Sequence, residues 1–185
     1  MVKLTIDGIQ VEAEKGTSIL HAAESVGIEV PTLCYIKDLL PDGSCRMCMV
    51  EIESRGRTKM ETACTAQVAE GLVVTTNSEK VRNARRNILD MLLSNHKTDC
   101  FSCPSNGDCK LQELCFEYGI ERTTYSGEQT ELPIDDSNKF FTYNPNLCIL
   151  CHRCVNTCHK IVGRGAIDTM ERGFDSAIGT PFHID

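Results

Sequence analysis

Hydrophobic and polar residues follow one another in short runs along the first third of the chain. Four such runs predict β-strands, at residues 2–6, 9–13, 48–52 and 72–76. The first two runs enclose Asp7-Gly8, a dipeptide that favours a tight hairpin turn. Arg55-Gly56 indicates a further turn after the third run. The pattern therefore predicts a small sheet at the start of the chain.

One helix is predicted between the second and third strands. Thr17 or Ser18 can cap its start, and Gly27 favours its end after about residue 26. Its apolar face is expected to consist of Ile19, Ala22, Ala23 and Val26. Strand, hairpin, helix and further strands in this order indicate an α+β fold of the β-grasp type.

The middle of the chain has the period of an α-helix. A helix over residues 79–94 places one apolar stripe along its length, formed by Val81, Ala84, Ile88 and Leu92. Arg82, Arg85 and Arg86 largely occupy the other faces, and we interpret them as a solvated surface. A short helix is predicted after residue 109, with Leu111, Leu114, Cys115 and Tyr118 at helical spacing.

Cysteines dominate the chemistry that the chain can offer. All but one of the twelve fall, with one histidine, into three groups. The first is Cys34, Cys45, Cys48 and Cys64, the second is His96, Cys100, Cys103 and Cys109, and the third is Cys148, Cys151, Cys154 and Cys158. Thiolates are the ligands that iron–sulfur clusters need. Three groups in series predict a path for single electrons along one chain.

The first group has the spacing C-x10-C-x2-C-x15-C. A 2Fe–2S cluster needs two thiolates on each iron, and a loop that carries three cysteines can surround it while a distant fourth closes the site. Gly43-Ser44 allows a tight turn before Cys45. A four-cysteine zinc site has the same number of ligands, but zinc sites usually pair two C-x2-C motifs. Cys34 and Cys64 are single, which favours the 2Fe–2S cluster.

The second group has the spacing H-x3-C-x2-C-x5-C and follows the long helix directly. Each iron of a 4Fe–4S cluster needs one ligand, and His96 can supply the fourth. Imidazole in place of a thiolate removes a negative charge and would raise the reduction potential. Zinc with three cysteines and one histidine is the competing interpretation. The neighbouring groups favour iron.

The third group, C-x2-C-x2-C-x3-C, is typical of bacterial ferredoxins. Its first three cysteines can hold three corners of a 4Fe–4S cluster. Cys158 is expected to serve the second cluster of a two-cluster domain, or else to be the fourth ligand. No second run of cysteines follows, so we expect the third cluster and its domain to be incomplete in this chain alone. His152 and His159 are interpreted as surface residues.

Other features restrict the class of protein. The net charge of −7 and the absence of a basic run argue against a nucleic-acid partner. No signal peptide, membrane span or nucleotide-binding motif is found, and the cytoplasm is expected, where thiols stay reduced and disulfides are rare. Cys115 is interpreted as a small buried hydrophobe, and no partner is predicted for His21 or His183. No residue is predicted to be catalytic.

The three motifs in this order resemble the N-terminal iron–sulfur region of NAD(P)-linked, electron-bifurcating iron-only hydrogenases, and the related large iron–sulfur subunit of respiratory NADH dehydrogenase. The segments HKTDCFSCPSNGDCKLQEL and NLCILCHRCVNTC carry the resemblance. It implies a β-grasp 2Fe–2S domain over residues 1–78 and a helical, histidine-ligated 4Fe–4S module over 79–118. A linker over 119–138 and a bacterial-type 4Fe–4S ferredoxin domain over 139–185 complete the expected α+β organisation.

The resemblance also implies partners. They are a flavin- and NAD(P)-binding redox subunit, a catalytic hydrogenase or dehydrogenase domain or subunit, and a soluble ferredoxin as a further possibility. The segment ERGFDSAIGTPF favours the hydrogenase branch. The equivalent part of an NAD-dependent formate or NADH dehydrogenase is the alternative. A zinc-binding or redox-sensing interaction module is the alternative from another class.

Overall fold

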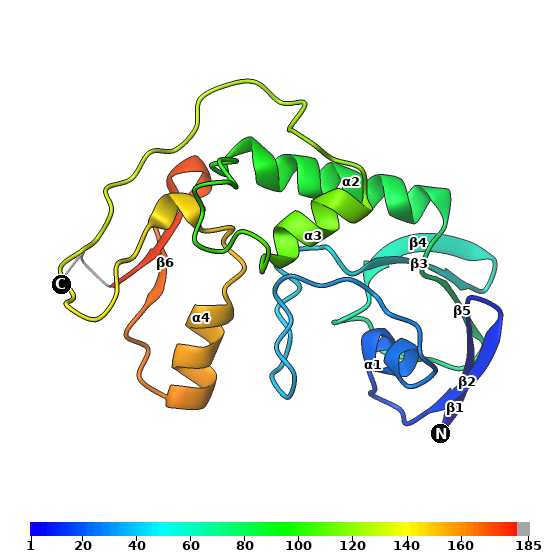
Figure 1. Ribbon diagram of the computed structural model, residues 1–185. Coiled ribbons are helices and arrows are strands. Elements are labelled where there is room, and N and C mark those ends of the chain that lie inside the picture. Colours follow the sequence, from blue (N-terminus) through cyan, green and yellow to red (C-terminus); the bar gives the residue numbers. More distant parts are fainter. Residues whose placement is uncertain (181–185) are drawn as a thin grey trace.

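A mixed five-stranded sheet forms the first part of the molecule, as the computed structural model of residues 1–180 shows (Figure 1). Its strands are β1 Val2–Ile6, β2 Ile9–Ala13, β3 Met49–Ser54, β4 Arg57–Thr62 and β5 Leu72–Thr75. Their order across the sheet is β2-β1-β5-β3-β4. Only β1 and β5 run parallel, and the other neighbours are antiparallel. The four strands predicted from the sequence are present, and β4 was not predicted.

One helix packs on this sheet. Helix α1, Ile19–Glu24, buries Ile19, Leu20, Ala22 and Ala23 against inward-facing residues of the strands. The Ser18 hydroxyl accepts a hydrogen bond from the His21 amide, so Ser18 is the predicted cap. The helix ends two residues earlier than expected, because the Ser25 hydroxyl binds the Ala22 carbonyl and Gly27 takes a φ of +78°.

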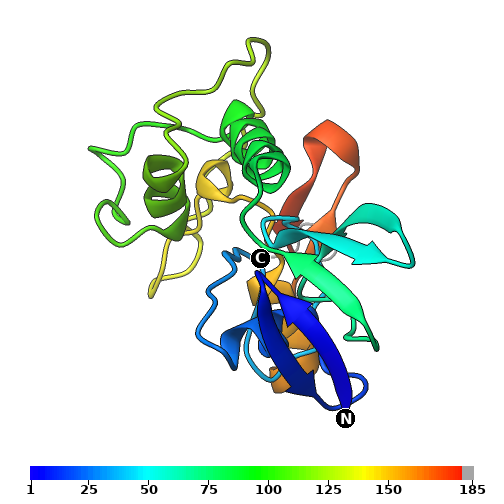
Figure 2. The same ribbon diagram turned by 90° about the vertical axis from the view of Figure 1, so that its right-hand side faces the viewer.

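Helices α2, Glu79–Ser94, and α3, Lys110–Glu117, lie to one side of the sheet (Figures 1 and 2). They share a second hydrophobic core with the segment that carries the first cysteine group. Its buried members are Leu33, Met47, Leu89, Leu93, Leu111, Leu114, Cys115 and Tyr118. Both predicted helices are therefore present, and Cys115 is buried as expected.

The prediction of a solvated arginine face on α2 is wrong for Arg85. This side chain is only 3% exposed, whereas Arg82 and Arg86 are exposed. The buried stripe of α2 repeats every fourth residue, through Val81, Arg85, Leu89 and Leu93. Only Val81 of the predicted stripe is fully buried, so the helix is rotated slightly from the expected orientation and Arg85 faces inward.

The last part of the described chain consists of short elements. These are the 3₁₀ turn η1 Pro145–Leu147, helix α4 Arg153–Asn156, the π-helical turn η2 Thr157–Val162, and a hairpin of β6 Asp168–Met170 and β7 Ala177–Gly179 around the turn η3 Gly173–Asp175. Residues 181–185, which include His183 and the end of the predicted ferredoxin domain, lie outside the described residues. No helix within residues 1–180 is long and apolar enough to cross a membrane.

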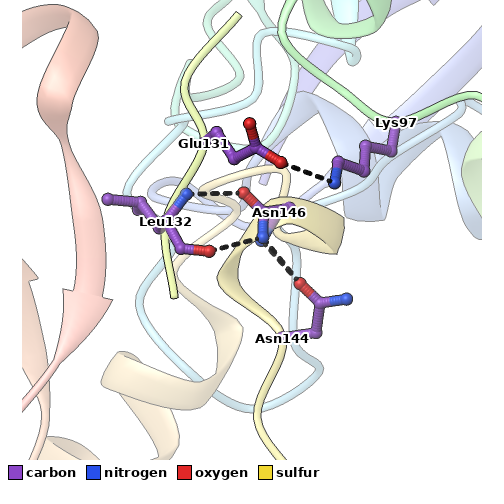
Figure 3. Close-up of polar contacts among 5 residues, drawn as sticks. All are labelled: Lys97, Glu131, Leu132, Asn144 and Asn146. Carbon is purple, nitrogen blue, oxygen red and sulfur yellow. Dashed lines mark hydrogen bonds and ion pairs between the residues drawn. The ribbon is translucent and has the colours of Figure 1, made fainter. Parts of the chain in front are cut away.

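The predicted linker is irregular, and it is tied to the rest of the molecule by hydrogen bonds. Asp90 on α2 accepts hydrogen bonds from Thr123 and Thr124, and the Asn95 side chain pairs with Thr130. At its far end the segment pairs with Asn146, just before the third cysteine group (Figure 3). The segment is therefore anchored first at the C-terminal half of α2 and then at Asn146, and between these points it arches away from the helix (Figure 1).

Candidate metal centres

The first cysteine group is assembled at the junction of the sheet and the second core. Cys34, Cys48 and Cys64 are buried and Cys45 is half-buried. Gly43 in the loop before them has a φ of +64°, and a Cβ there would lie 3.2 Å from the Thr65 methyl and 3.9 Å from the Cys64 sulfur. Glycine therefore lets the loop close over the cysteines, as the sequence predicted.

The four side chains of this group form two pairs. The sulfurs of Cys48 and Cys64 lie 3.3 Å apart, and this hydrogen bond lowers the pKa of Cys48 to about 7. A hydrogen bond with Cys45 lowers the pKa of Cys34 to about 5, and the same bond raises that of Cys45. The fold thus stabilises a thiolate in each pair. Two pairs of sulfurs match a cluster with two irons, each bound by two thiolates.

Part of the second group lines a cavity of about 400 Å³ between α3 and the loop that follows α2. His96, Cys100, Cys109 and Cys115 are among the residues that line it. Cys103 lies one turn from Cys100 and its amide donates to the Cys100 carbonyl. Sequence reasoning did not place Cys115 at this cavity, although its position between one and two helical turns after Cys109 is compatible with it.

His96 has the properties expected of a metal ligand. Its Nδ1 atom is buried and has no hydrogen-bond partner within residues 1–180. Burial lowers the pKa of the imidazole, which favours the neutral form that binds metals. Nearby, the Gln112 side chain bonds to Gly107 and Asn106 and so fixes the loop between Cys103 and Cys109 to α3. The donor set fits a cluster with mixed sulfur and nitrogen ligands.

Cys148 and Cys151 of the third group lie in the turn between η1 and α4, and Cys154 lies in α4 itself. Leu150 and His152 have φ angles of +52° and +58°, and this left-handed backbone turns the chain tightly enough to bring successive cysteines together. The Leu150 amide donates to the Cys148 sulfur at 3.4 Å. Burial raises the pKa of Cys148, and so do the nearby charges of Cys151 and Cys154. These three cysteines therefore share one neighbourhood.

Cys158 belongs to a different environment. Its sulfur accepts a hydrogen bond from the Ala166 amide at 3.2 Å, and hydrogen bonds from the backbone of residues 165–167 lower its pKa. His159 is exposed, as predicted, and its Nε2 lies 3.1 Å from the Ile167 carbonyl oxygen. His152 is half-buried and bonds to Thr169, so the expectation of a surface residue was wrong in its case.

The first and third groups are joined by direct contacts. The Ser44 hydroxyl, beside Cys45, donates to the Cys151 carbonyl at 3.5 Å. Asp42 accepts hydrogen bonds from Asn156 and Lys160, and the first of these is the main reason for its lowered pKa. Ile149, beside Cys148, and Cys109 of the second group both pack against the second core, which also contacts Cys45. The three groups are thus brought together although long segments of chain separate them.

Two tyrosines near the groups, Tyr35 and Tyr143, were not singled out from the sequence. His21 on α1 bonds to the hydroxyl of Tyr35, which follows Cys34, so His21 has a partner after all. The hydroxyl of Tyr143 is buried near Cys148 and Cys154, and burial is the main cause of its raised pKa. No three His, Cys, Asp or Glu side chains within residues 1–180 converge on the position of a single metal ion.

Two family comparisons agree with this geometry. Residues 1–79 match the family described as "2Fe-2S iron-sulfur cluster binding domain". Residues 85–124 match the "NADH-ubiquinone oxidoreductase-G iron-sulfur binding region". The first match contains the whole first cysteine group and the second contains the whole second group. The chain therefore contains a 2Fe–2S domain and a 4Fe–4S-binding region.

Curated relatives cover nearly the whole chain. The NADPH-Fe(3+) oxidoreductase subunit alpha of Geobacter sulfurreducens is 40% identical over 100% of the chain, and the NADP-reducing hydrogenase subunit HndD of Solidesulfovibrio fructosivorans is 35% identical over 100%. The mitochondrial NADH-ubiquinone oxidoreductase 78 kDa subunit of Candida albicans is 36% identical over 97%. The chain spans 22%, 32% and 25% of the lengths of these relatives.

A solved structure is also similar over most of its length. The crystal structure of an NAD+-reducing [NiFe]-hydrogenase in the H2-reduced state superposes with a TM-score of 0.88 and 30% identity, over 97% of this chain and 75% of that chain. Fold, cysteine geometry and family matches together define an iron–sulfur electron-transfer protein. The chain belongs to the family of iron–sulfur electron-transfer subunits that NAD(P)-linked hydrogenases share with NADH dehydrogenases.

Proposed function

We propose that the chain relays single electrons through three iron–sulfur sites. The ligands of the 2Fe–2S site are Cys34, Cys45, Cys48 and Cys64. Those of the 4Fe–4S site are His96, Cys100, Cys103 and Cys109. Cys148, Cys151 and Cys154 hold a further 4Fe–4S site, and Cys158 serves a second cluster of that domain. When bound, such clusters accept and donate one electron at a time.

The pairing of the first four cysteines is the observation that carries this proposal. Cys34 with Cys45 and Cys48 with Cys64 supply two sulfurs to each of two irons. Each pair contains a thiol whose pKa is lowered to about 7 or below, which favours the thiolate that iron binds. The Nδ1 of His96, which is buried and has no hydrogen-bond partner among the described residues, supports the second site because it can bind a metal.

The proposed modules follow the contacts within the chain. Residues 1–78 form a β-grasp ferredoxin domain around the first site, and residues 79–118 form a helical module around the second. Residues 119–138 connect this module to a bacterial-type ferredoxin domain over 139–185. The proposal is supported by the sheet order, by the α2–α3 pair and by the separate environment of Cys158.

The proposed setting is an NAD(P)-linked hydrogenase complex, electron-bifurcating or not, in the cytoplasm, where thiolates remain reduced. The chain would pass electrons between a flavin- and NAD(P)-binding partner and a hydrogen-activating site. The names of two relatives, an NADP-reducing hydrogenase subunit and an NAD+-reducing hydrogenase, support this setting. An NADH dehydrogenase is the second candidate, because another relative is named as a subunit of an NADH-ubiquinone oxidoreductase.

Low-temperature electron paramagnetic resonance tests the proposal. After anaerobic purification and reduction with dithionite, the protein should give a slowly relaxing 2Fe–2S signal and a faster-relaxing 4Fe–4S signal. Iron and acid-labile sulfide should be present in amounts that match at least these two clusters. A colourless protein that contains zinc, or a single signal with the iron of one cluster, would refute the proposal.

A further inference from the structure

Arg85 is a buried cation in a position that usually holds an apolar side chain. It lies between Val81 and Leu89 on the inward stripe of α2, and only 3% of it is exposed. Arginine keeps its charge in proteins, so burial cannot be relieved by loss of a proton. A buried charge is strongly unfavourable unless an opposite charge lies near it. The fold must therefore supply a negative partner.

Neutral groups accept hydrogen bonds from only two of the three guanidinium nitrogens, as far as residues 1–180 show. Nη1 donates to the hydroxyl of Tyr118 at 2.9 Å, and Nη2 donates to the carbonyl oxygen of Met49 at 2.8 Å. Nε is buried and has no hydrogen-bond partner within residues 1–180. No acidic side chain of the described residues forms an ion pair with Arg85. The protein side chains thus leave its charge uncompensated.

The hydrogen bond to Met49 points to the first cysteine group as the source of a compensating charge. Met49, whose carbonyl holds the guanidinium, directly follows Cys48. On the other side, Tyr118 packs in the second core with Met47 and Cys45. A 2Fe–2S cluster with four thiolates is an anion, and reduction adds a further negative charge to it. Within a low-dielectric interior such charges interact over several ångströms.

We propose that Arg85 is the internal counter-cation of the 2Fe–2S site, and that it stabilises the reduced form and so raises the midpoint potential. The inference rests on the proposed ligation by Cys34, Cys45, Cys48 and Cys64. Arg85 acts through the field of its charge and not as a ligand, so it is a positioning residue, and its two hydrogen bonds hold the guanidinium in place. The two hydrogen bonds alone could be made by a neutral donor, whereas the effect on the potential requires the charge.

Potentiometric titration of the 2Fe–2S signal in the full, anaerobically purified protein tests this role. Arg85→Gln should retain iron and sulfide and shift the midpoint potential to a more negative value. Arg82→Gln is the matched control, because Arg82 is exposed on the same helix three residues earlier. It should leave the potential unchanged. Arg85→Lys keeps the charge and should also stay close to the parent protein.

The outcomes separate the inference from the proposed function. Intact clusters with the same potential in Arg85→Gln and the parent protein would overturn the role of Arg85 only. A parent protein without a 2Fe–2S signal would overturn the ligation itself. Where Arg85→Gln does not fold, Arg85→Met replaces it, because methionine fills the site without charge. Where no neutral variant folds, Arg85→Lys decides, since a displaced potential with intact clusters contradicts a role of the charge.

Discussion

Asn146 allows the attachment of the segment over 119–138 to be tested quantitatively. Its side chain is 8% exposed and makes three hydrogen bonds (Figure 3). Nδ2 donates to the Leu132 carbonyl at 2.8 Å and to Asn144 Oδ1 at 3.0 Å, and Oδ1 accepts from the Leu132 amide at 2.9 Å. Asn146→Ala removes all three. At about 1 kcal/mol for each bond, less what water restores at the half-buried Leu132, the local loss is about 2 kcal/mol.

Amide hydrogen exchange at Leu132 measures this loss directly. A local loss of about 2 kcal/mol corresponds to roughly thirty-fold faster exchange, because about 1.4 kcal/mol is a factor of ten. Asn138→Ala is the control, since among residues 1–180 the Asn138 side chain accepts a hydrogen bond only from the nearby Phe140 amide. It should leave the exchange at Leu132 unchanged. An unchanged rate in Asn146→Ala would show that Asn146 does not hold this segment.

Two further predictions concern the second site. His96→Ala should lose about four iron atoms per chain, the content of one 4Fe–4S cluster. His159→Ala should lose none, because His159 is exposed and bonded to the Ile167 carbonyl. Equal iron content in the two variants would contradict the assignment of His96. Cys115→Ala should keep its iron and lower the free energy of unfolding by about 1 kcal/mol, because burial raises the pKa of Cys115 to about 11 and leaves a neutral, packed thiol. Iron analysis and thermal unfolding measure both effects, and loss of iron would make Cys115 a ligand.

Much of the sheet could be predicted because its central strands bury one face. β1 and β3 alternate inward residues such as Ile6 and Val50 with outward ones, which is the signal that sequence reasoning uses. β4 escaped prediction because it is an edge strand whose first three residues are exposed on both faces. Its pairing with β3 is decided by the Arg55-Gly56 turn, where both residues have positive φ angles.

The burial of Arg85 and the path of the linker were not predicted, because both depend on tertiary packing. The spacing of Val81, Arg85, Leu89 and Leu93 is itself a helical stripe, so a count of every fourth residue would have placed Arg85 inside. The apolar residues alone indicate a different stripe on this helix, because charged residues are usually exposed and Arg85 was placed on the solvent side. The linker had no apolar period, and its fixed path depends on side-chain hydrogen bonds from distant residues such as Asp90 and Asn146.

The candidate sites were predictable to a similar degree. Cysteine spacing predicts the members of the three groups, because ligand chemistry restricts both residue type and distance along the chain, and these ligand assignments stay predictions. The division of the first group into two pairs depends on the folded loop, and so does the place of Cys115 at the second cavity. The contact of Ser44 with Cys151 joins parts of the chain that are far apart in sequence, and no local pattern indicates it.

The second core has a consequence for how this protein can be divided. Leu33 and Met47 belong to the first cysteine segment, yet they pack against Leu89, Leu111 and other residues of α2 and α3. A protein cut before α2 would expose these apolar side chains to water at the point where the cysteines must be held still. The segments that carry the first two cysteine groups therefore share one core and depend on each other for folding. We therefore expect a protein cut after Ile120 to keep both segments folded more readily than a protein cut near residue 79.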